Sequence, residues 1–526
     1  MFAALPYSLE HGSMAFFCHR GIESRVQRKN ASMGLISRIR SFFMGRFSSS
    51  RLEKVFDIRI QAQPDMGGFI SDWQKAYQGN PDWVGPGNDQ IPFSLDLAST
   101  IVNDIAMKTV SEAAIAPDGA DGADDALLGA FIGDEVMPEL RRQTEYGLAM
   151  GAFIARPYFD TETHRICLSW YSPDLFVPVA WNGRRCISGI FIDQFEESKG
   201  DGVSKWYTKL ELQKWTYGRD GLGGSVDISV KAFVSDDPNE LQREISLADV
   251  PRWAGISASA HIDNLTSPLF VYAPTPFSNN KNLNSKMGVS LYKDGMTHLQ
   301  EIDRTWNALR WEREFTEGKI FVDQDMLECE RTKDGELRTK INGKDKRIYT
   351  VMEANGNIPK FMEVFSPAIR QSDYVSMIKT HLSLLCTACH LDSGAYIYDE
   401  ATNAVTATEV RTKNQQTYQT IVDVQNNMLT PAIDRIVEAT RQMQLLYGLP
   451  SFRDGLKVNV SYGDSILIDT ESDKQNAQRE TQMGLRSKLN YLMEYRGLSE
   501  EDARRELELI DSETPQQIDF FGGGNG

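Results

Sequence analysis

The chain has 526 residues, 41% hydrophobic and 25% charged, which is enough for about two to four domains at roughly 100–200 residues each. It has 56 Lys and Arg and 73 Asp and Glu, which give a net charge of −17. This charge argues against a surface that binds nucleic acid nonspecifically. It does not exclude a channel wall past which DNA moves without being tightly bound. The sequence lacks a run of about 18 apolar residues that would predict a membrane-spanning helix, and its six scattered cysteines favour a reducing cytoplasm over a disulfide scaffold.

Residues 1–50 are predicted to form a flexible leader. The basic, amphipathic stretch 33–44 favours a partner-binding arm or a disordered segment over a helix on a membrane surface. Met33 is an alternative start of the chain.

Residues 51–287 are predicted to form an antiparallel, β-rich body with helices on its flank. Apolar spacing from Leu95 to Ala106 predicts an amphipathic helix, and the acidic tract 118–125 is predicted to be a solvated loop because it lacks the spacing of a calcium loop. Turn signals at Asn182-Gly183 and 221–224 separate the strands. The strands are expected at 152–159, 166–170, 176–179, 187–192, 206–215, 226–233 and 269–272.

A long helix of roughly 40 Å is predicted over Gly288–Phe315. Its apolar face includes Leu291, Leu299, Ile302 and Trp306, and its remaining faces carry Glu301, Asp303, Arg304, Glu312 and Glu314. Residues 316–360 follow as strands with two hairpin signals, Asp334-Gly335 and Asn342-Gly343. Their local charge is basic, which favours a solvated edge hairpin over contact with DNA or an acidic partner.

Two further helices are predicted over 366–391 and 406–447, separated by a loop rich in Gly, Tyr and acids. The second would run about 60 Å, and Pro431 is expected to kink it near Met428 to Thr430. A helix of this length cannot be packed along its whole length in a compact domain, which indicates a large assembly.

After Pro450, residues 457–462 alternate as a strand that rejoins the β body. Charge-dense helices follow, one with Leu485, Leu489 and Leu492 on a face and another capped by Ser499 with Asp502.

Cys386-Thr-Ala-Cys389-His390 has the spacing of a covalent haem site. Both cysteines continue the buried stripe of their helix, so a structural role is favoured over haem, redox or zinc chemistry. Phosphate-loop, His-Glu-x-x-His and Gly-x-Ser-x-Gly motifs are absent from the sequence. We therefore expect no enzyme activity, no cofactor and no metal.

Several short motifs occur in an order that resembles the portal proteins of tailed bacteriophages, in particular the siphophage type. They are Tyr146–Ile154 with Phe176–Pro178, Lys319–Val322, Gly394–Asp399 and Val405–Val410. Each motif is weak alone, but together they cover most of residues 70 to 510. The stretch before Met33 and the acidic insert near Asp118 depart from the family pattern.

The resemblance implies an α+β portal fold and a head-to-tail connector, a homo-oligomeric ring that typically has twelve copies at one capsid vertex. Double-stranded DNA would be packaged and ejected through its channel, and the expected partners are the terminase large subunit, a head-completion or adaptor protein, and the major capsid and scaffolding proteins, with no membrane. The expected location is the virion, with assembly in the host cytoplasm. The implied segments are a wing (51–287), two stem helices (288–315 and 361–391), a small α/β clip (316–360), a tunnel loop (392–405), a kinked helix with wing return (406–470), a helical crown (471–513) and a flexible tail (514–526).

The resemblance also assigns two candidate sites. The tunnel loop would face DNA through weak contacts from its tyrosines and repulsion from its acids; its candidate residues are Asp392, Ser393, Gly394, Tyr396, Tyr398, Asp399, Glu400 and Asn403. The clip would dock partners through Lys333, Arg338, Lys340, Lys344, Lys346 and Arg347. Two alternatives remain: a cytoplasmic α+β redox or metal protein that uses Cys386, Cys389 and His390, and a DNA-binding scaffold that uses the basic hairpin.

Overall fold

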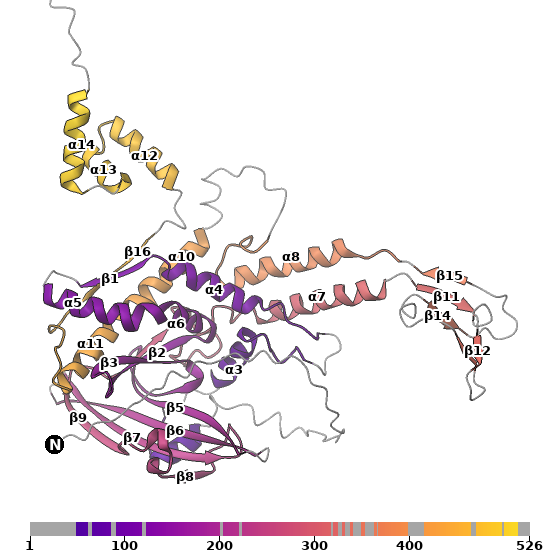
Figure 1. Cartoon of the computed structure of the whole chain (residues 1–526), viewed down its shortest axis with the longest axis horizontal. Coiled ribbons are helices and arrows are strands. Elements are labelled where there is room, and N and C mark those ends of the chain that lie inside the picture. The colour runs from indigo at the N-terminus through magenta and orange to yellow at the C-terminus, as the bar shows by residue number, and fades with distance from the viewer. Residues whose placement is uncertain are drawn as a thin grey trace, which may run out of the picture. The chain divides into compact units, whose positions relative to one another are not determined.

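The computed structural model of the chain describes most of the residues between Ser49 and Glu513 (Figure 1). Residue contacts divide the chain into two compact units, one of residues 1–398 with 419–462 and the other of residues 399–418 with 463–526. The predictions for residues 1–48 and 514–526 lie outside the described residues. Those that are described are 49–60, 66–85, 91–117, 122–199, 203–219, 223–316, 319–323, 329–331, 337–339, 349–352, 362–365, 367–397, 415–463, 470–496 and 499–513.

The centre of the first unit is an antiparallel sheet of six strands, which confirms the predicted antiparallel β-rich body. Its order is β4 (Phe176–Asn182), β5 (Arg185–Lys199), β6 (Val203–Tyr217), β7 (Gly224–Ser235) and β8 (Arg243–Ile245), and β9 (Ser259–Leu265) also pairs with β7. Both predicted turns join neighbouring strands, with Gly183 at φ 59° and the Gly218 N–H donating to Gly223 O at 2.7 Å.

A second sheet and a helix complete the hydrophobic core. The sheet is antiparallel in the order β10 (Val271–Pro274), β2 (Ala152–Asp160) and β3 (Arg165–Tyr171). Met443 of α11 (Thr430–Leu446) packs in one core cluster with Trp215 and Val226 of the large sheet, so α11 covers part of that sheet. We refer to the two sheets together as the sheet body.

Several helices flank the sheet body: α2 (Ser49–Phe56), α3 (Met66–Tyr77), α4 (Leu97–Val110), α5 (Gly122–Phe131) and α6 (Met137–Met150). The amphipathic helix predicted over residues 95–106 is confirmed as α4. The loop predicted for the whole acidic tract is wrong from Gly122 onward, because Gly122–Asp125 form the first turn of α5. Aspartates in the first turn of a helix are favoured by the helix dipole, which a comparison with calcium loops does not take into account.

Helices α7 (Met296–Phe315) and α8 (Gln371–Ala388) lie side by side and form what we call the helix pair (Figure 1). The predicted start of the first helix at Gly288 is wrong, because residues 288–290 are irregular and residues 291–295 form turns. Leu291 and Tyr292 are fully buried; the Leu291 N–H donates to Leu148 O of α6 at 2.8 Å, and the Tyr292 hydroxyl donates to Trp73 O of α3 at 2.8 Å. Their apolar character therefore reflects burial against the flanking helices and not a helix face.

Helix α8 is also shorter than the predicted 366–391, and its end is a Schellman motif. The Leu391 N–H donates to Cys386 O at 2.8 Å and the His390 N–H to Thr387 O at 3.1 Å, with His390 at φ 58° in the left-handed region. Leu391 is fully buried, so this motif fixes the direction in which the chain leaves the helix.

The described residues between the helices of the pair are strands. β11 (Lys319–Asp323) pairs in parallel with β14 (Tyr349–Met352) and antiparallel with β15 (Met362–Phe365), while β12 (Cys329–Arg331) pairs antiparallel with β13 (Leu337–Thr339). The hairpin signal Asp334-Gly335 agrees with the pairing of β12 and β13. The hairpin signal Asn342-Gly343 lies outside the described residues, and the described strands on either side of it, β13 and β14, belong to different sheets. The helical part expected of a small α/β clip does not occur in the described residues there.

The last long helix is interrupted just before Pro431. It consists of α10 (Gln415–Val424), a π-helix over Gln425–Leu429 and α11. Proline has no N–H to donate, so a wider turn before it relieves the lost backbone hydrogen bond. The interruption coincides with the residues where the kink was expected; residues 406–414 lie outside the described residues.

The chain then returns to the first unit and ends in the second. β16 (Val458–Tyr462) confirms the predicted strand, but it pairs antiparallel with β1 (Ala113–Pro117) in a separate two-stranded sheet, so the predicted return to the β body is wrong. In the second unit, α12 (Thr470–Gln482), α13 (Lys488–Arg496) and α14 (Glu500–Glu513) follow, and the Asp502 N–H donates to the capping hydroxyl of Ser499 at 3.2 Å. Leu485 was wrongly placed on a helix face with Leu489 and Leu492, because it precedes α13 and is 78% exposed.

We predict that Gly151→Ala destabilises the protein by about 2 kcal/mol or more. Gly151 has φ 99°, and a Cβ there would lie 2.5 Å from Gly288 O. Thermal or denaturant unfolding measures the loss. Gly129→Ala is the matched control, because a Cβ at this helical position meets nothing within 4 Å, and it should be neutral or slightly stabilising. Equal stabilities of the two variants would contradict the prediction.

Candidate functional site

Helix α7 is anchored at one side by a buried aspartate. Asp303 is 4% exposed, and it accepts hydrogen bonds from Trp83 Nε1 at 3.0 Å and from the Leu95 N–H at 2.8 Å. Burial raises the pKa of Asp303, and the two hydrogen bonds work against that shift. One turn later, Asn307 Nδ2 donates to Phe93 O at 2.7 Å. Trp83, Phe93 and Leu95 therefore hold one side of the helix in place.

The two helices of the pair are also tied to each other at the C-terminal end of α7. Glu312 accepts hydrogen bonds from the Arg370 backbone N–H and from Arg370 Nη2, both at 2.9 Å. These bonds lower the pKa of Glu312 to about 2. At the other end, Gly295 lets Leu385 approach so closely that a Cβ would lie 2.4 Å from Leu385 Cδ1.

The sequence predicted Asp303 and Glu312 on the faces of the helix away from its apolar face. Both are instead buried, with only 4% of each residue exposed. Their partners Trp83 and Arg370 lie far away in the sequence, so the local pattern of α7 carried no signal for either contact.

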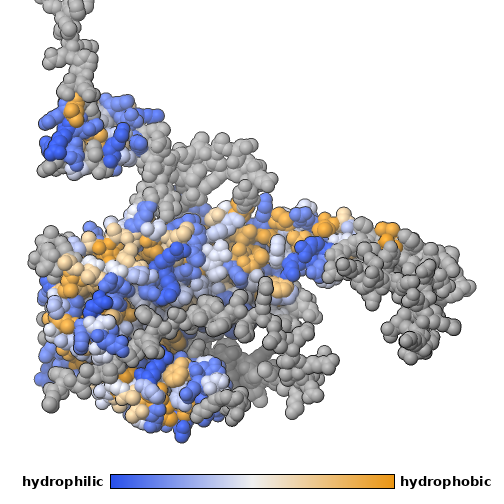
Figure 2. Space-filling model, viewed as in Figure 1, coloured by the Kyte–Doolittle hydropathy of each residue, from blue (hydrophilic) through white to orange (hydrophobic). Residues whose placement is uncertain are grey.

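The helix pair exposes a set of large apolar side chains to solvent, visible as hydrophobic areas on α7 and α8 in Figure 2. Trp311 is 63% exposed and stacks on Phe315 with ring centroids 5.1 Å apart. The other members are Trp306, Ile369, Val375, Met377 and Leu384. Soluble monomers rarely expose contiguous apolar patches, so this surface indicates a further partner.

The Cys-x-x-Cys-His motif does not converge on a site. Cys386 and Cys389 are fully buried free thiols, and burial raises the pKa of both. The ring of His390, by contrast, stacks on Phe277 with centroids 6.0 Å apart. Buried thiols of raised pKa are poor thiolate ligands and poor nucleophiles. In the described part of the chain, no three His, Cys, Asp or Glu side chains come together as a metal site.

The loop after α8 is described only as far as residue 397. A turn brings the Ala395 N–H to Asp392 O at 2.9 Å, and Ser393 and Gly394 are exposed. Tyr396 was expected to face DNA; it is half-buried, its hydroxyl donates to Asp104 Oδ2 of α4 at 2.8 Å, and burial raises its pKa. The other candidate residues, Tyr398, Asp399, Glu400 and Asn403, lie outside the described residues.

The basic candidates of the predicted clip are described at one position. Arg338 of β13 stands opposite Glu330 of β12 in the antiparallel register. Lys333, Lys340, Lys344, Lys346 and Arg347 lie outside the described residues, so their role in docking stays a prediction.

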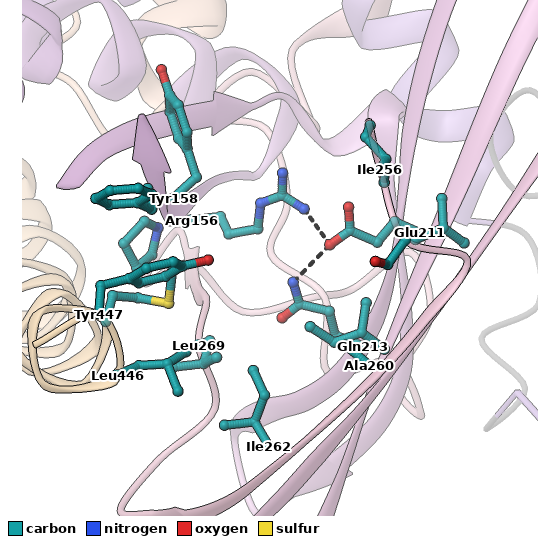
Figure 3. Close-up of a pocket in the computed structure, with 16 residues that line it drawn as sticks. Arg156, Tyr158, Glu211, Gln213, Ile256, Ala260, Ile262, Leu269, Leu446 and Tyr447 are labelled. Carbon is teal, nitrogen blue, oxygen red and sulfur yellow. Dashed lines mark hydrogen bonds and ion pairs between the residues drawn. The ribbon is translucent and has the colours of Figure 1, made fainter. Parts of the chain in front are cut away.

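A pocket of about 70 Å³ lies in the sheet body, and Figure 3 shows its polar floor. Arg156 of β2 donates to Glu211 of β6, and Gln213 Nε2 donates to the same carboxylate oxygen at 2.9 Å. Burial alone raises the pKa of Glu211, but the charges of Arg156 and Lys209 outweigh it, and the pKa is lowered. The remaining walls are mostly apolar, with Ile262, Leu269 and Leu446 among them. The ion pair thus connects the two sheets.

Comparison with known proteins identifies one family. The family model described as "Phage portal protein, SPP1 Gp6-like" matches residues 73–519. A solved structure titled "Neck of empty GTA particle computed with C6 symmetry" is similar at 11% identity and a TM-score of 0.34, over 80% of this chain and 90% of that one. No curated protein sequence matches. None of the helices in the described residues is long and apolar enough to cross a membrane.

We predict that the contribution of Glu312 to stability is lost in acid. Its pKa is about 2 in the folded protein against an ordinary 4.5, so the stabilisation is present above pH 4.5 and disappears as the pH falls toward 2. The melting temperature of Glu312→Gln should therefore lie below that of the wild type at pH 7, and the gap should narrow by pH 3. Glu314→Gln, which alters an exposed neighbour, is the control. A gap that is the same at both pH values would refute the assignment.

Proposed function

Because this chain belongs to the SPP1 Gp6-like family of phage portal proteins, we propose that it forms a closed ring at one capsid vertex through which double-stranded DNA is packaged and ejected. A portal protein is a structural head-to-tail connector of the virion, and the expected ring has typically twelve copies. Assembly in the host cytoplasm is part of the proposal.

The exposed apolar surface of the helix pair carries the proposal. A ring needs a heterologous interface, in which one surface of each subunit packs on a different surface of the next. Trp311, Phe315 and Met377 would be buried by a neighbouring copy, and fully burying one side chain of this size stabilises by roughly 1.5–3 kcal/mol. In this assembly α7 and α8 are the stem helices.

The loop over residues 392–405 is proposed to face the passing DNA. Each close pairing of a cation with a phosphate adds affinity that would stall a moving strand, so a passage needs few of them. The net charge of −17 suits such a wall. The bond between Tyr396 and Asp104 would fix the start of the loop on α4.

The segment 316–360 is proposed as the clip, where the terminase large subunit docks during packaging and the head-completion or adaptor protein docks afterwards. Its basic residues, Arg338 among them, suit acidic partner surfaces. Contacts with the major capsid and scaffolding proteins would fall on the outer part of the ring.

The redox or metal alternative has less support, because Cys386 and Cys389 are buried and His390 stacks on Phe277. The DNA-binding scaffold through the basic hairpin remains a second hypothesis, and the family match favours the portal.

We expect Trp311→Ser/Phe315→Ser to weaken ring formation at least about tenfold in subunit concentration, because two apolar contacts per interface are lost. Light scattering and negative-stain microscopy report the assembly, and the melting temperature of the subunit should stay unchanged. Leu283→Ser, at an 88% exposed residue outside the helix pair, is the control. Rings that form as readily as in the wild type would exclude this interface.

Deleting residues 394–403 should leave ring assembly intact but impair DNA packaging in a reconstituted assay. A second variant, in which Gly and Ser replace these residues at the same length, separates the role of loop length from that of side-chain chemistry. Normal packaging by both variants would count against the loop.

A further inference from the structure

Two histidines face each other across the helix pair. His298 of α7 and His381 of α8 have their Nδ1 atoms 3.4 Å apart, with ring centroids 5.6 Å apart and ring planes at 46°. Both side chains are half-buried. An N–H···N hydrogen bond at this separation is long, so the contact is weak unless something bridges the two nitrogens.

The separation fits a metal bridge. Imidazole nitrogens bind Zn²⁺ at about 2.0–2.1 Å, and at a tetrahedral angle two such nitrogens lie about 3.3–3.4 Å apart. We propose that His298 and His381 form a site for a divalent transition metal ion of the Zn²⁺, Ni²⁺ and Cu²⁺ class, which clamps α7 to α8.

Metal binding needs the neutral imidazole with a free lone pair.

The acidic side chains near His298 in the sequence already form ion pairs with basic residues. Asp294 accepts from Lys281 Nζ at 2.9 Å and also pairs with Lys293, and Glu301 accepts from Arg304 at 2.8 Å. A third ligand of the His, Cys, Asp or Glu type is not found in the described residues, so water would fill the remaining positions. Such a site prefers Cu²⁺, Ni²⁺ and Zn²⁺ over the oxygen-seeking Mg²⁺.

The clamp would lie about one turn from the contact between Gly295 and Leu385, at the end of the pair opposite Glu312 and Arg370. A bridge between His298 and His381 would fix this end of the pair, whether or not a ring forms.

The test uses the full-length protein stripped of metal with a chelator. Isothermal titration with ZnSO₄ and NiCl₂ should show binding to the wild type, and MgCl₂ should show none. His298→Ala and His381→Ala should each weaken zinc binding at least tenfold, and the melting temperature of the wild type should rise with zinc while those of the variants stay fixed. His164→Asn alters an exposed histidine in the left-handed region, which Asn tolerates, and should bind like the wild type. A variant with both His298→Ala and His381→Ala that still binds zinc as tightly as the wild type would overturn the proposal.

A second measurement does not depend on variants that fold. One equivalent of Cu²⁺ added to the wild type should give an electron paramagnetic resonance spectrum with coupling to two imidazole nitrogens. A spectrum with oxygen ligands alone, or with one imidazole, would overturn the two-histidine site.

Discussion

The position of the helix pair depends on one backbone contact, between Gly151 and Gly288. Neither residue can carry a side chain there, since a Cβ on Gly288 would lie 1.8 Å from Gly151 O. Thr275 stabilises the contact through two hydrogen bonds. Its N–H donates to Gly151 O at 2.9 Å, and its hydroxyl donates to Val289 O at 2.7 Å. Thus the end of α6, the edge strand β10 and the segment before α7 meet at one point. The segment that leads into α7 is therefore held to the sheet body at this point.

Much of the fold follows from apolar spacing, because period two and period 3.6 report directly which side chains avoid water. The strands of the sheet body and helices α4, α7 and α8 were predicted in this way. Spacing does not say what covers a residue, and this accounts for the failures. Leu291 and Tyr292 were assigned to a helix although they are buried in turns, with hydrogen bonds to α6 and α3. Likewise, β14 pairs in parallel with β11, which no local turn signal encodes.

The candidate site was harder to predict from the sequence than the fold. A residue's type gives the chemistry of its side chain but does not say which other residues that side chain contacts. Cys386 and Cys389 have haem spacing, yet both point into the core while His390 begins the turn that ends α8. Tyr396 was expected to contact DNA, yet its hydroxyl donates a hydrogen bond to Asp104, which lies 292 residues earlier in the sequence. The family resemblance agrees with the family match over residues 73–519. It could not reveal contacts between distant residues such as His298 and His381.

The pairing of β1 with β16 has a consequence for synthesis of the chain. This two-stranded contact closes a loop that contains the sheet body, the helix pair and α11, because residues 118–457 lie between its strands. Contacts of such sequence separation form late in folding, since the chain must first pay the entropy of closing the loop. A ribosome adds residues from the N-terminus, so β1 cannot pair until Tyr462 has emerged. Chains shorter than this therefore lack the closure, and the sheet of β1 and β16 forms only after most of the subunit has been made.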